Sequence, residues 1–198
     1  VVVHAHVGVH DLLPPLWQPL RLVAAHSTLL RLGPRGLTSL GVEVVILMDQ
    51  RVLLVLRDDF HVWALPGGGV DPNESLVQAA MREVREETGL VVTLSRLVGF
   101  YSRPDWCNGG DNDALYVGQP TSGRFINESN EVRAIGFFDP DDLPHPMVGW
   151  HRQRIRDAVS GAIGVTRTQH TPWPFDSSWS LADVRRKFRA GELDQDDV

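Results

Sequence analysis

The sequence has few of the features that mark secreted or membrane-spanning proteins. Cys107 is the single cysteine among 198 residues, so an internal disulfide is excluded and a reducing compartment is expected. No apolar run reaches about 18 residues, the length that a transmembrane helix requires. The N-terminus lacks the charged-then-apolar order of a signal peptide. These absences predict a cytoplasmic protein that has no membrane partner.

An excess of positive charge is also missing. The formal net charge is −6, which disfavours stable binding to nucleic acid or to an anionic membrane. A phosphate-bearing ligand must then be held locally, by a metal ion, backbone amides and a few arginines. Hydrophobic residues make up 42% of the chain and charged residues 22%, an ordinary globular balance. The length suggests one domain with additions at its ends.

What the sequence does contain is a glycine-rich turn followed by an acidic helix. Three consecutive glycines, from Gly67 to Gly69, let the backbone approach a ligand closely. Asp71 and Asn73 are candidate helix caps, and Gly89 is predicted to end the helix. Between them, apolar residues recur at helical spacing and give one apolar stripe, formed by Leu76, Val77, Ala80, Met81 and Val84.

Three glutamates lie beside that stripe. At about 100° per residue, Glu83, Glu86 and Glu87 fall within an arc of roughly 100° on the predicted helix. Carboxylates placed so closely repel one another unless a cation sits among them. Because the ligands on offer are all oxygens, the pattern favours Mg²⁺ or Mn²⁺ over zinc. Arg82 is the expected partner that orients or neutralises one carboxylate.

Written as spacing, residues 68–90 give G-x5-E-x7-R-E-V-x-E-E-x-G-L, which resembles the Nudix box in full. The resemblance implies a Nudix hydrolase with an α/β fold, an α/β/α sandwich built around a mixed sheet. It further implies metal-dependent hydrolysis of a diphosphate bond in a nucleoside diphosphate linked to another group, a small-molecule substrate. By the same resemblance, the metal ligands are Glu83, Glu86, Glu87 and the Gly68 carbonyl, and the catalytic residues are Arg82 with Glu86, Glu87 or Glu131 as base.

The flanking sequence is consistent with such a domain over residues 41–160. Strands are predicted at 41–48, 52–56, 62–64, 91–101, 114–119 and 132–138, and a second helix at 146–160. Residues 1–40 form a helical N-terminal extension, expected to pack against the domain or against the second subunit of a homodimer. Residues 161–198 form a tail with a short helix at 180–190, which begins with a capping-box pattern.

A loop is predicted from Ser102 to Asp113, and it adjoins three candidate substrate-binding residues. Arg103 could pair with a phosphate, and Tyr101 or Trp106 could stack on a base. The same aromatic residues could instead cover the core. The proline-rich stretch 170–175 is interpreted as a packing segment of the tail.

Two alternatives to a hydrolase stay open at this stage. One is a catalytically silent Nudix domain that senses a nucleotide, although the full set of glutamates favours an enzyme. The other is an enzyme similar to isopentenyl diphosphate isomerase, which shares the fold and uses a cysteine. Cys107 would be that cysteine, but the box here is complete whereas that of the isomerase is modified.

Overall fold

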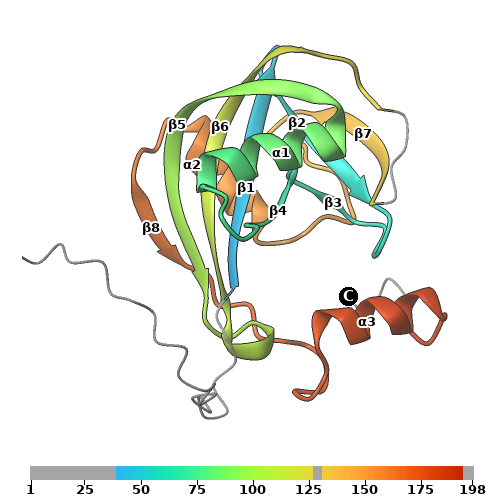
Figure 1. The fold of residues 1–198 in the computed structure, drawn as a ribbon. Coiled ribbons are helices and arrows are strands. Elements are labelled where there is room, and N and C mark those ends of the chain that lie inside the picture. Colours follow the sequence, from blue (N-terminus) through green and yellow to red (C-terminus); the bar gives the residue numbers. More distant parts are fainter. Residues whose placement is uncertain (1–38, 127–130, 194–198) are drawn as a thin grey trace, which may run out of the picture. The chain divides into compact units, whose positions relative to one another are not determined.

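The computed structural model describes residues 39–126 and 131–193, and all structural statements concern these ranges. The predicted helix in the N-terminal extension lies outside them. The elements, shown in Figure 1, are β1 (Ser39–Met48), β2 (Arg51–Arg57), β3 (Trp63–Ala64), β4 (Gly67–Gly69), α1 (Leu76–Thr88), β5 (Leu90–Arg103), a 3₁₀ turn (Cys107–Gly109), β6 (Asp111–Gly123), β7 (Val132–Phe138), α2 (His151–Val159), β8 (Val165–Thr168) and α3 (Leu181–Arg189).

The strands form one mixed sheet. Its main order is β3-β2-β1-β6-β5-β8, with β4 paired to β1 and β7 paired to β2. The β1–β6 and β5–β8 pairs are parallel, and the other strand pairs are antiparallel. β1 and β2 are joined by Asp49 and Gln50, which have φ of 49° and 63°. Two left-handed residues in a two-residue loop match the twist of a hairpin, as the predicted strand pair requires.

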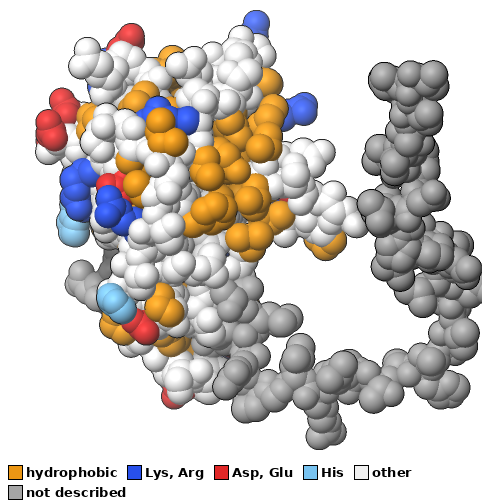
Figure 2. Space-filling view, turned by 90° about the vertical axis from the view of Figure 1, so that its left-hand side faces the viewer, with side chains coloured by type: hydrophobic (Ala, Val, Ile, Leu, Met, Phe, Trp, Pro, Cys, Tyr) orange, Lys and Arg blue, Asp and Glu red, His pale blue; other side chains and the backbone are white. Residues whose placement is uncertain are grey.

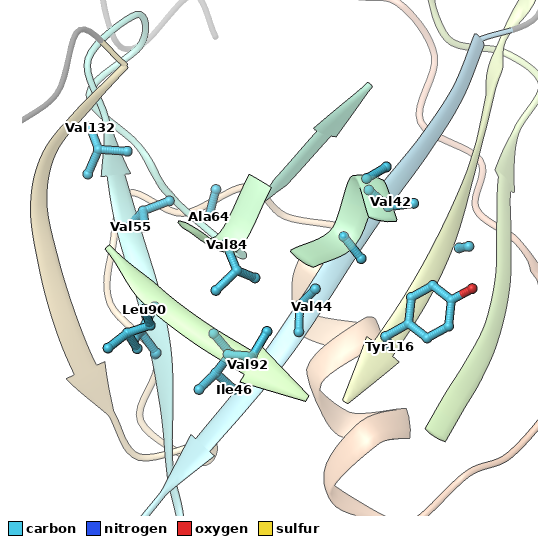
Figure 3. Packing of buried hydrophobic residues seen from close by; sticks show 14 residues of the cluster. Val42, Val44, Ile46, Val55, Ala64, Val84, Leu90, Val92, Tyr116 and Val132 are labelled. Atoms are coloured by element: carbon cyan, nitrogen blue, oxygen red, sulfur yellow. The ribbon is translucent and has the colours of Figure 1, made fainter. Parts of the chain in front are cut away.

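Side chains alternate between the two faces of the sheet, and each face carries its own buried cluster. On β1, Val42, Val44 and Ile46 pack against α1, as Figure 3 shows for the first cluster. Val45 points the other way and packs with Ile155 of α2. The two helices therefore cover opposite faces of the sheet. The predicted α/β/α sandwich with a mixed sheet is confirmed.

Helix α1 ends where the sequence predicts but begins later. Gly89 adopts the left-handed conformation, with φ of 76°, and its amide donates to the carbonyl of Arg85. The expected caps, Asp71 and Asn73, are wrong, because Asn73 has φ of 66° and cannot take the extended conformation of an N-cap. Ser75 caps the helix instead, in a capping box with Gln78.

The second helix is shorter than predicted, because it begins at His151 rather than at Pro146. The preceding residues are extended beside β3. The Trp63 amide donates to the Pro146 carbonyl, and the Val148 amide donates to the Trp63 carbonyl. Of the predicted helical stretch, residues 146–148 therefore pair with a strand, and residues 149–150 form the turn into α2.

The loop predicted at 102–113 is also shorter than expected. β5 continues to Arg103 and β6 starts at Asp111, and these two residues face each other in the ladder. Their side chains form an ion pair across the strands. A cross-strand pair of opposite charge stabilises the last rung of an antiparallel ladder, so the strands extend until this rung.

The C-terminal segment is tied to the sheet and to a third cluster. β8 adds a parallel strand next to β5, which the sequence did not indicate. The predicted helix is present as α3, with Ser180 and Asp183 forming its capping box. Val184 of α3 is fully buried against Phe60 and Val62. The segment is thus part of the folded unit that contains the sheet.

One face of the molecule carries exposed hydrophobic side chains. Figure 2 looks onto the side that lies to the left in Figure 1 and shows a patch of such side chains in the middle of this face, with most charged side chains toward one edge. Within the described ranges, the large hydrophobic residues exposed to solvent include Phe100 and Ile163. None of the described helices is long and apolar enough to cross a membrane.

Candidate active site

The glycine strand β4 pairs with β1. It directly precedes the segment that leads into α1, and its backbone lies against the acidic face of this helix. The Gly67 amide donates to Oε2 of Glu87 at 2.9 Å. Arg82 Nη2 donates to the Gly69 carbonyl at 2.9 Å. A Cβ built on Gly68 would lie 2.6 Å from Oε1 of Glu83, closer than real contacts allow. A side chain at position 68 would therefore displace the Glu83 carboxylate from the backbone.

Arg82 contacts three glutamates, two on α1 and one in the segment that precedes this helix. Its guanidinium donates to Glu74 at 2.9 Å, to Glu83 at 2.8 Å and to Glu86 at 3.1 Å. The hydrogen bond with Glu74, followed by those with Glu83 and Glu86, raises the pKa of Arg82, so the arginine stays charged. Arg82 was predicted to orient one carboxylate, and the structure shows it in contact with three.

The three box glutamates differ in their environments. Glu86 is largely exposed, whereas Glu83 and Glu87 are buried. Burial raises the pKa of Glu83, and it raises that of Glu87 to about 8 against the opposing effects of the Gly67 amide and Arg57. Glu131, at the start of β7, acts electrostatically on both. Glu83, Glu87 and Glu131 thus lie close enough to influence one another. Glu86 shares the Arg82 guanidinium with Glu83.

The donor set suits a hard divalent cation. Glu83, Glu86, Glu87 and the Gly68 carbonyl offer oxygen only, and the Gly68 backbone lies directly against the Glu83 carboxylate. Across residues 39–126 and 131–193, no three acidic, histidine or cysteine side chains converge as a ready metal site. The reason is visible in the contacts: Arg82 draws Glu83 and Glu86 toward itself, while Glu87 accepts from Gly67. The residues fit the ion by chemistry, and their side chains must turn to bind it.

A cavity of about 850 Å³ lies next to the glycine strand. Gly67, Gly68 and Gly69 line it. Of these, Gly67 donates to the Glu87 carboxylate and Gly68 lies against that of Glu83, while the Gly69 carbonyl accepts from Arg82. The cavity is therefore continuous with the candidate metal site. Its other lining residues come from β1, β6, the segment before α2, and the C-terminal segment.

Two of the three predicted substrate-binding residues line this cavity. Arg103 is held by Asp111 and lies over the Trp150 ring, with its central carbon 3.9 Å from the centroid. The same carbon is 4.6 Å from the Trp106 ring. Tyr101 is fully buried elsewhere and does not line the cavity; its hydroxyl donates to Asp157 of α2. Arg103 and Trp106 are thus brought together, and Tyr101 belongs to the core beneath α2.

A buried charged cluster beside the cavity was not foreseen from the sequence. Arg154 of α2, with no exposed surface, donates to Glu43 of β1 at 2.5 Å and to Asp113 of β6 at 2.8 Å. His151 Nδ1 accepts from the Leu65 amide, so its proton lies on Nε2, which is 2.9 Å from Glu43. Glu43, Asp113 and His151 all line the cavity.

The two carboxylates of this cluster titrate in opposite directions. Burial alone would raise the pKa of Glu43, but the charge of Arg154, together with the hydrogen bonds from His151 and Arg154, lowers it well below its usual range. Burial and the neighbouring Glu43 raise the pKa of Asp113 to about 6. Burial lowers the pKa of His151, so the ring is neutral near pH 7. No sequence signal could have found this cluster, because its members come from three separate elements.

Arg57 and the C-terminal segment also contribute cavity residues that sequence reasoning missed. Arg57 and Arg185 both donate to the buried carboxylate of Asp59, at 2.6 and 2.9 Å. Burial opposes ionisation of Asp59, but the bond from Arg57 outweighs it and the pKa is lowered. The only sequence feature that could have indicated these cavity residues is the alternation of Arg57 and Asp59 at the end of a predicted strand.

Comparison with known proteins gives the same fold and box. A family model described as NUDIX domain matches residues 38–158. The chain is 39% identical over 129 residues to a Bacillus subtilis protein named "Putative 8-oxo-dGTP diphosphatase", covering 65% of this chain and 85% of that protein. It is 31% identical over 122 residues to the ADP-ribose pyrophosphatase of Methanocaldococcus jannaschii, covering 60% and 72%. The crystal structure of an ADP-ribose pyrophosphatase from Streptococcus suis superposes with a TM-score of 0.55 at 27% identity, covering 67% of this chain and 100% of that one.

The protein therefore belongs to the Nudix hydrolase family. The matched region contains β1 to α2, the glycine strand and the whole acidic face of α1. β8 and α3 lie beyond it, although residues around them line the cavity.

Proposed function

We propose that the protein hydrolyses a diphosphate bond in a nucleoside diphosphate linked to another group, with Mg²⁺ or Mn²⁺ as cofactor. One observation carries this proposal. The glycine strand β4 contacts the Glu83 and Glu87 carboxylates and also lines the cavity, so a ligand in the cavity meets the acidic face at the glycines. The similarity to proteins named as diphosphatases and pyrophosphatases supports the same reaction.

Glu83, Glu86, Glu87 and the Gly68 carbonyl would hold the cation, which when bound would offset the negative charge of the diphosphate. Arg82 keeps Glu83 and Glu86 near one another through Nη1. In the reaction, the oxygen of a water molecule forms a bond to phosphorus while the bridging P–O bond breaks. The proton of that water passes to a carboxylate.

Three carboxylates are candidates for this base. Glu87 has one oxygen fixed by the Gly67 amide at 2.9 Å, and burial favours its protonated form. Glu86 is exposed and bonded to Arg82, and Glu131 lies close enough to act on the charge of Glu87. Arg57 lines the cavity and also acts on Glu87, so it is suited to contact a substrate phosphate.

Cys107 is not suited to the isomerase alternative. Burial raises the pKa of its thiol, and the residue does not line the cavity. A thiol that stays protonated is a poor nucleophile, and one that lies outside the cavity cannot pass its proton to a ligand there.

The test is a substrate panel with Mg²⁺: nucleoside triphosphates, ADP-ribose, NADH, dinucleoside polyphosphates and nucleotide sugars. Release of a nucleoside monophosphate, diphosphate or phosphate is expected from at least one of them, and excess chelator should abolish it. Glu83→Gln should reduce this turnover by about 10²-fold or more. Glu192→Gln, a glutamate change outside the site, should have no effect. Nucleotide binding without turnover would instead indicate the silent sensor.

A further inference from the structure

The C-terminal segment forms part of the cavity wall although it lies beyond the family match. Six of its residues line the cavity: Trp173, Pro174, Phe175, Leu181, Val184 and Arg185. Val184 is fully buried, and Trp173 and Phe175 pack in the same cluster. Part of the cavity wall is therefore supplied by residues that a minimal domain ending at residue 158 does not have.

Hydrogen bonds and an ion pair attach this wall to other elements that line the cavity. The Gln169 side chain is buried, accepts from Arg154 at 3.0 Å and donates to the Trp150 carbonyl at 3.0 Å. The Trp173 amide donates to the Asp105 carbonyl at 3.1 Å. Arg185 is held by Asp59, which also holds Arg57. The segment is thus built into the domain through residues of the cavity itself.

Aromatic rings from two distant parts of the chain meet in this wall. Trp106, from the 104–110 connection, lies edge-to-face with Trp173 at 5.0 Å between centroids. Trp106 also packs on Trp150 at 4.8 Å, and Trp173 packs on Phe175 at 5.1 Å. All four residues line the cavity. Such a surface presents flat apolar rings to a ligand and disfavours a bare phosphate.

Polar atoms without partners lie beside these rings. Within the described ranges, Glu43 Oε2, Arg103 Nη1 and Trp150 Nε1 are buried and make no hydrogen bond. All three residues line the cavity, and Glu43 and Arg103 are more than nine-tenths buried. Buried polar atoms are normally satisfied, so these two donors and one acceptor mark a polar zone beside the aromatic rings. A nucleobase, a planar ring with donors and acceptors on its edge, matches a cavity lining that combines aromatic and polar groups.

We propose that Trp106, Trp173 and Phe175 form the nucleobase-binding wall of the cavity, so that the C-terminal segment determines substrate specificity. The proposal rests on the proposed function in taking the substrate to be a nucleotide. It places the base against the aromatic wall and the phosphates at the glycine strand, where the carboxylates of α1 begin. The cavity volume of about 850 Å³ is within the range of sites that enclose a ligand of this size.

The test compares binding of AMP, GMP, CMP and UMP with binding of ribose 5-phosphate, by calorimetry on the full chain. Base stacking on an aromatic ring should make at least one nucleotide bind about 10-fold or more tightly than ribose 5-phosphate. Trp173→Ala should remove most of this preference and leave the affinity for ribose 5-phosphate within about twofold. Equal binding of all five compounds by the parent would overturn the proposal.

Trp179 offers a matched control. It lies in the same segment and stacks on Phe175, with centroids 6.3 Å apart, but it does not line the cavity. Trp179→Ala should keep the nucleotide preference; a loss equal to that of Trp173→Ala would show a packing effect and sink the idea. If Trp173→Ala does not fold, Phe175→Leu replaces it, and an unchanged preference there would count against the wall.

Product binding needs no turnover, so the two proposals fail separately. A protein that prefers nucleotides through Trp173 but hydrolyses nothing overturns the proposed function alone. A protein that hydrolyses a substrate of the panel but shows no base preference overturns the wall alone.

Discussion

Arg82 and Arg154 each hold two or more carboxylates, yet their surroundings differ. Arg82 is partly exposed, and its partners are its own helix and the turn before it. Arg154 has no exposed surface, and it joins Glu43 and Asp113 from two strands. The Arg82 cluster consists of residues close in sequence and is open to solvent, so a ligand can rearrange its carboxylates. The second is assembled from the tertiary fold, and it is held rigidly.

The difference has an energetic basis. A buried ion pair gains from low dielectric only while both partners are present, and loss of one leaves an uncompensated buried charge. A solvent-accessible pair contributes little, because water replaces either partner. The Arg154 cluster should therefore govern stability, and the Arg82 cluster should govern chemistry.

The largest effect is expected from Arg154→Met. Removal of the guanidinium leaves Glu43 and Asp113 buried without a cation, so the free energy of unfolding should fall by about 3–5 kcal/mol. Arg82→Met is the matched control and should cost about 1 kcal/mol or less. Denaturant unfolding at pH 7 measures both. Similar losses in the two variants would remove the distinction between the clusters.

Glu87→Gln should have the next largest effect, on turnover rather than on stability. The change keeps the size of the side chain but removes the carboxylate that would ionise to bind the cation. We expect a loss in kcat of about 10²-fold, roughly 2.7 kcal/mol in the barrier. The Mg²⁺-induced rise in melting temperature should shrink as well. A variant that matches the parent in both kcat and this melting shift would show that Glu87 is not a metal ligand.

Gly68→Ala and Gly69→Ala form a matched pair that probes the contact between β4 and α1. A Cβ at Gly68 would meet the Glu83 carboxylate at 2.6 Å, whereas nothing lies within 4 Å of one at Gly69. Gly68→Ala should displace Glu83 and lower kcat by about 10-fold, near 1.4 kcal/mol. Gly69→Ala should keep kcat within about twofold. Equal activities of the two variants would exclude a role for this close approach.

The smallest effect concerns pH and the Arg154 cluster. The pKa of Asp113 is raised in the folded state from 3.8 to about 6, so folding binds its proton more tightly. Its contribution to stability is complete below pH 3.8 and is lost as pH rises through about 6. An asparagine side chain at this position does not titrate. Relative to the parent, Asp113→Asn should therefore gain about 1 kcal/mol between pH 5 and pH 7.

Unfolding curves of both proteins at several pH values measure this gain. Asp49→Asn, at the exposed hairpin turn, is the control and should follow the parent at every pH. A constant difference between Asp113→Asn and the parent would mean that Asp113 titrates normally.

Local patterns predicted much of the fold. The strand at Val132–Phe138 was predicted with its observed bounds, and Gly89 ends α1 as expected, because alternation and a left-handed cap depend on neighbours in sequence. The errors lie where distant contacts decide. Residues 146–148 were predicted to be helical but pair with Trp63, and the Arg103–Asp111 ion pair extends two strands into the predicted loop.

The candidate site divides in the same way. Arg82, Glu83, Glu86 and Glu87 share one helix, so 3.6-residue spacing alone set them on one face. The position of β4 against α1 decides which of these side chains are buried, and it brings the Gly67 amide within hydrogen-bond distance of Glu87. Tyr101 shows the converse: its place after the box suggested a ligand contact, and α2 buries it.

The sequence by itself determined the family, the acidic helix face and the glycine turn, because each depends on residues that are close together in sequence. Only the tertiary structure decided the buried Arg154 cluster and the aromatic wall from Trp106 and Trp173. The residues of each cluster are far apart in sequence. They come together only when the sheet, α2 and the C-terminal segment bury their apolar faces against one another, and local residue spacing does not predict this packing.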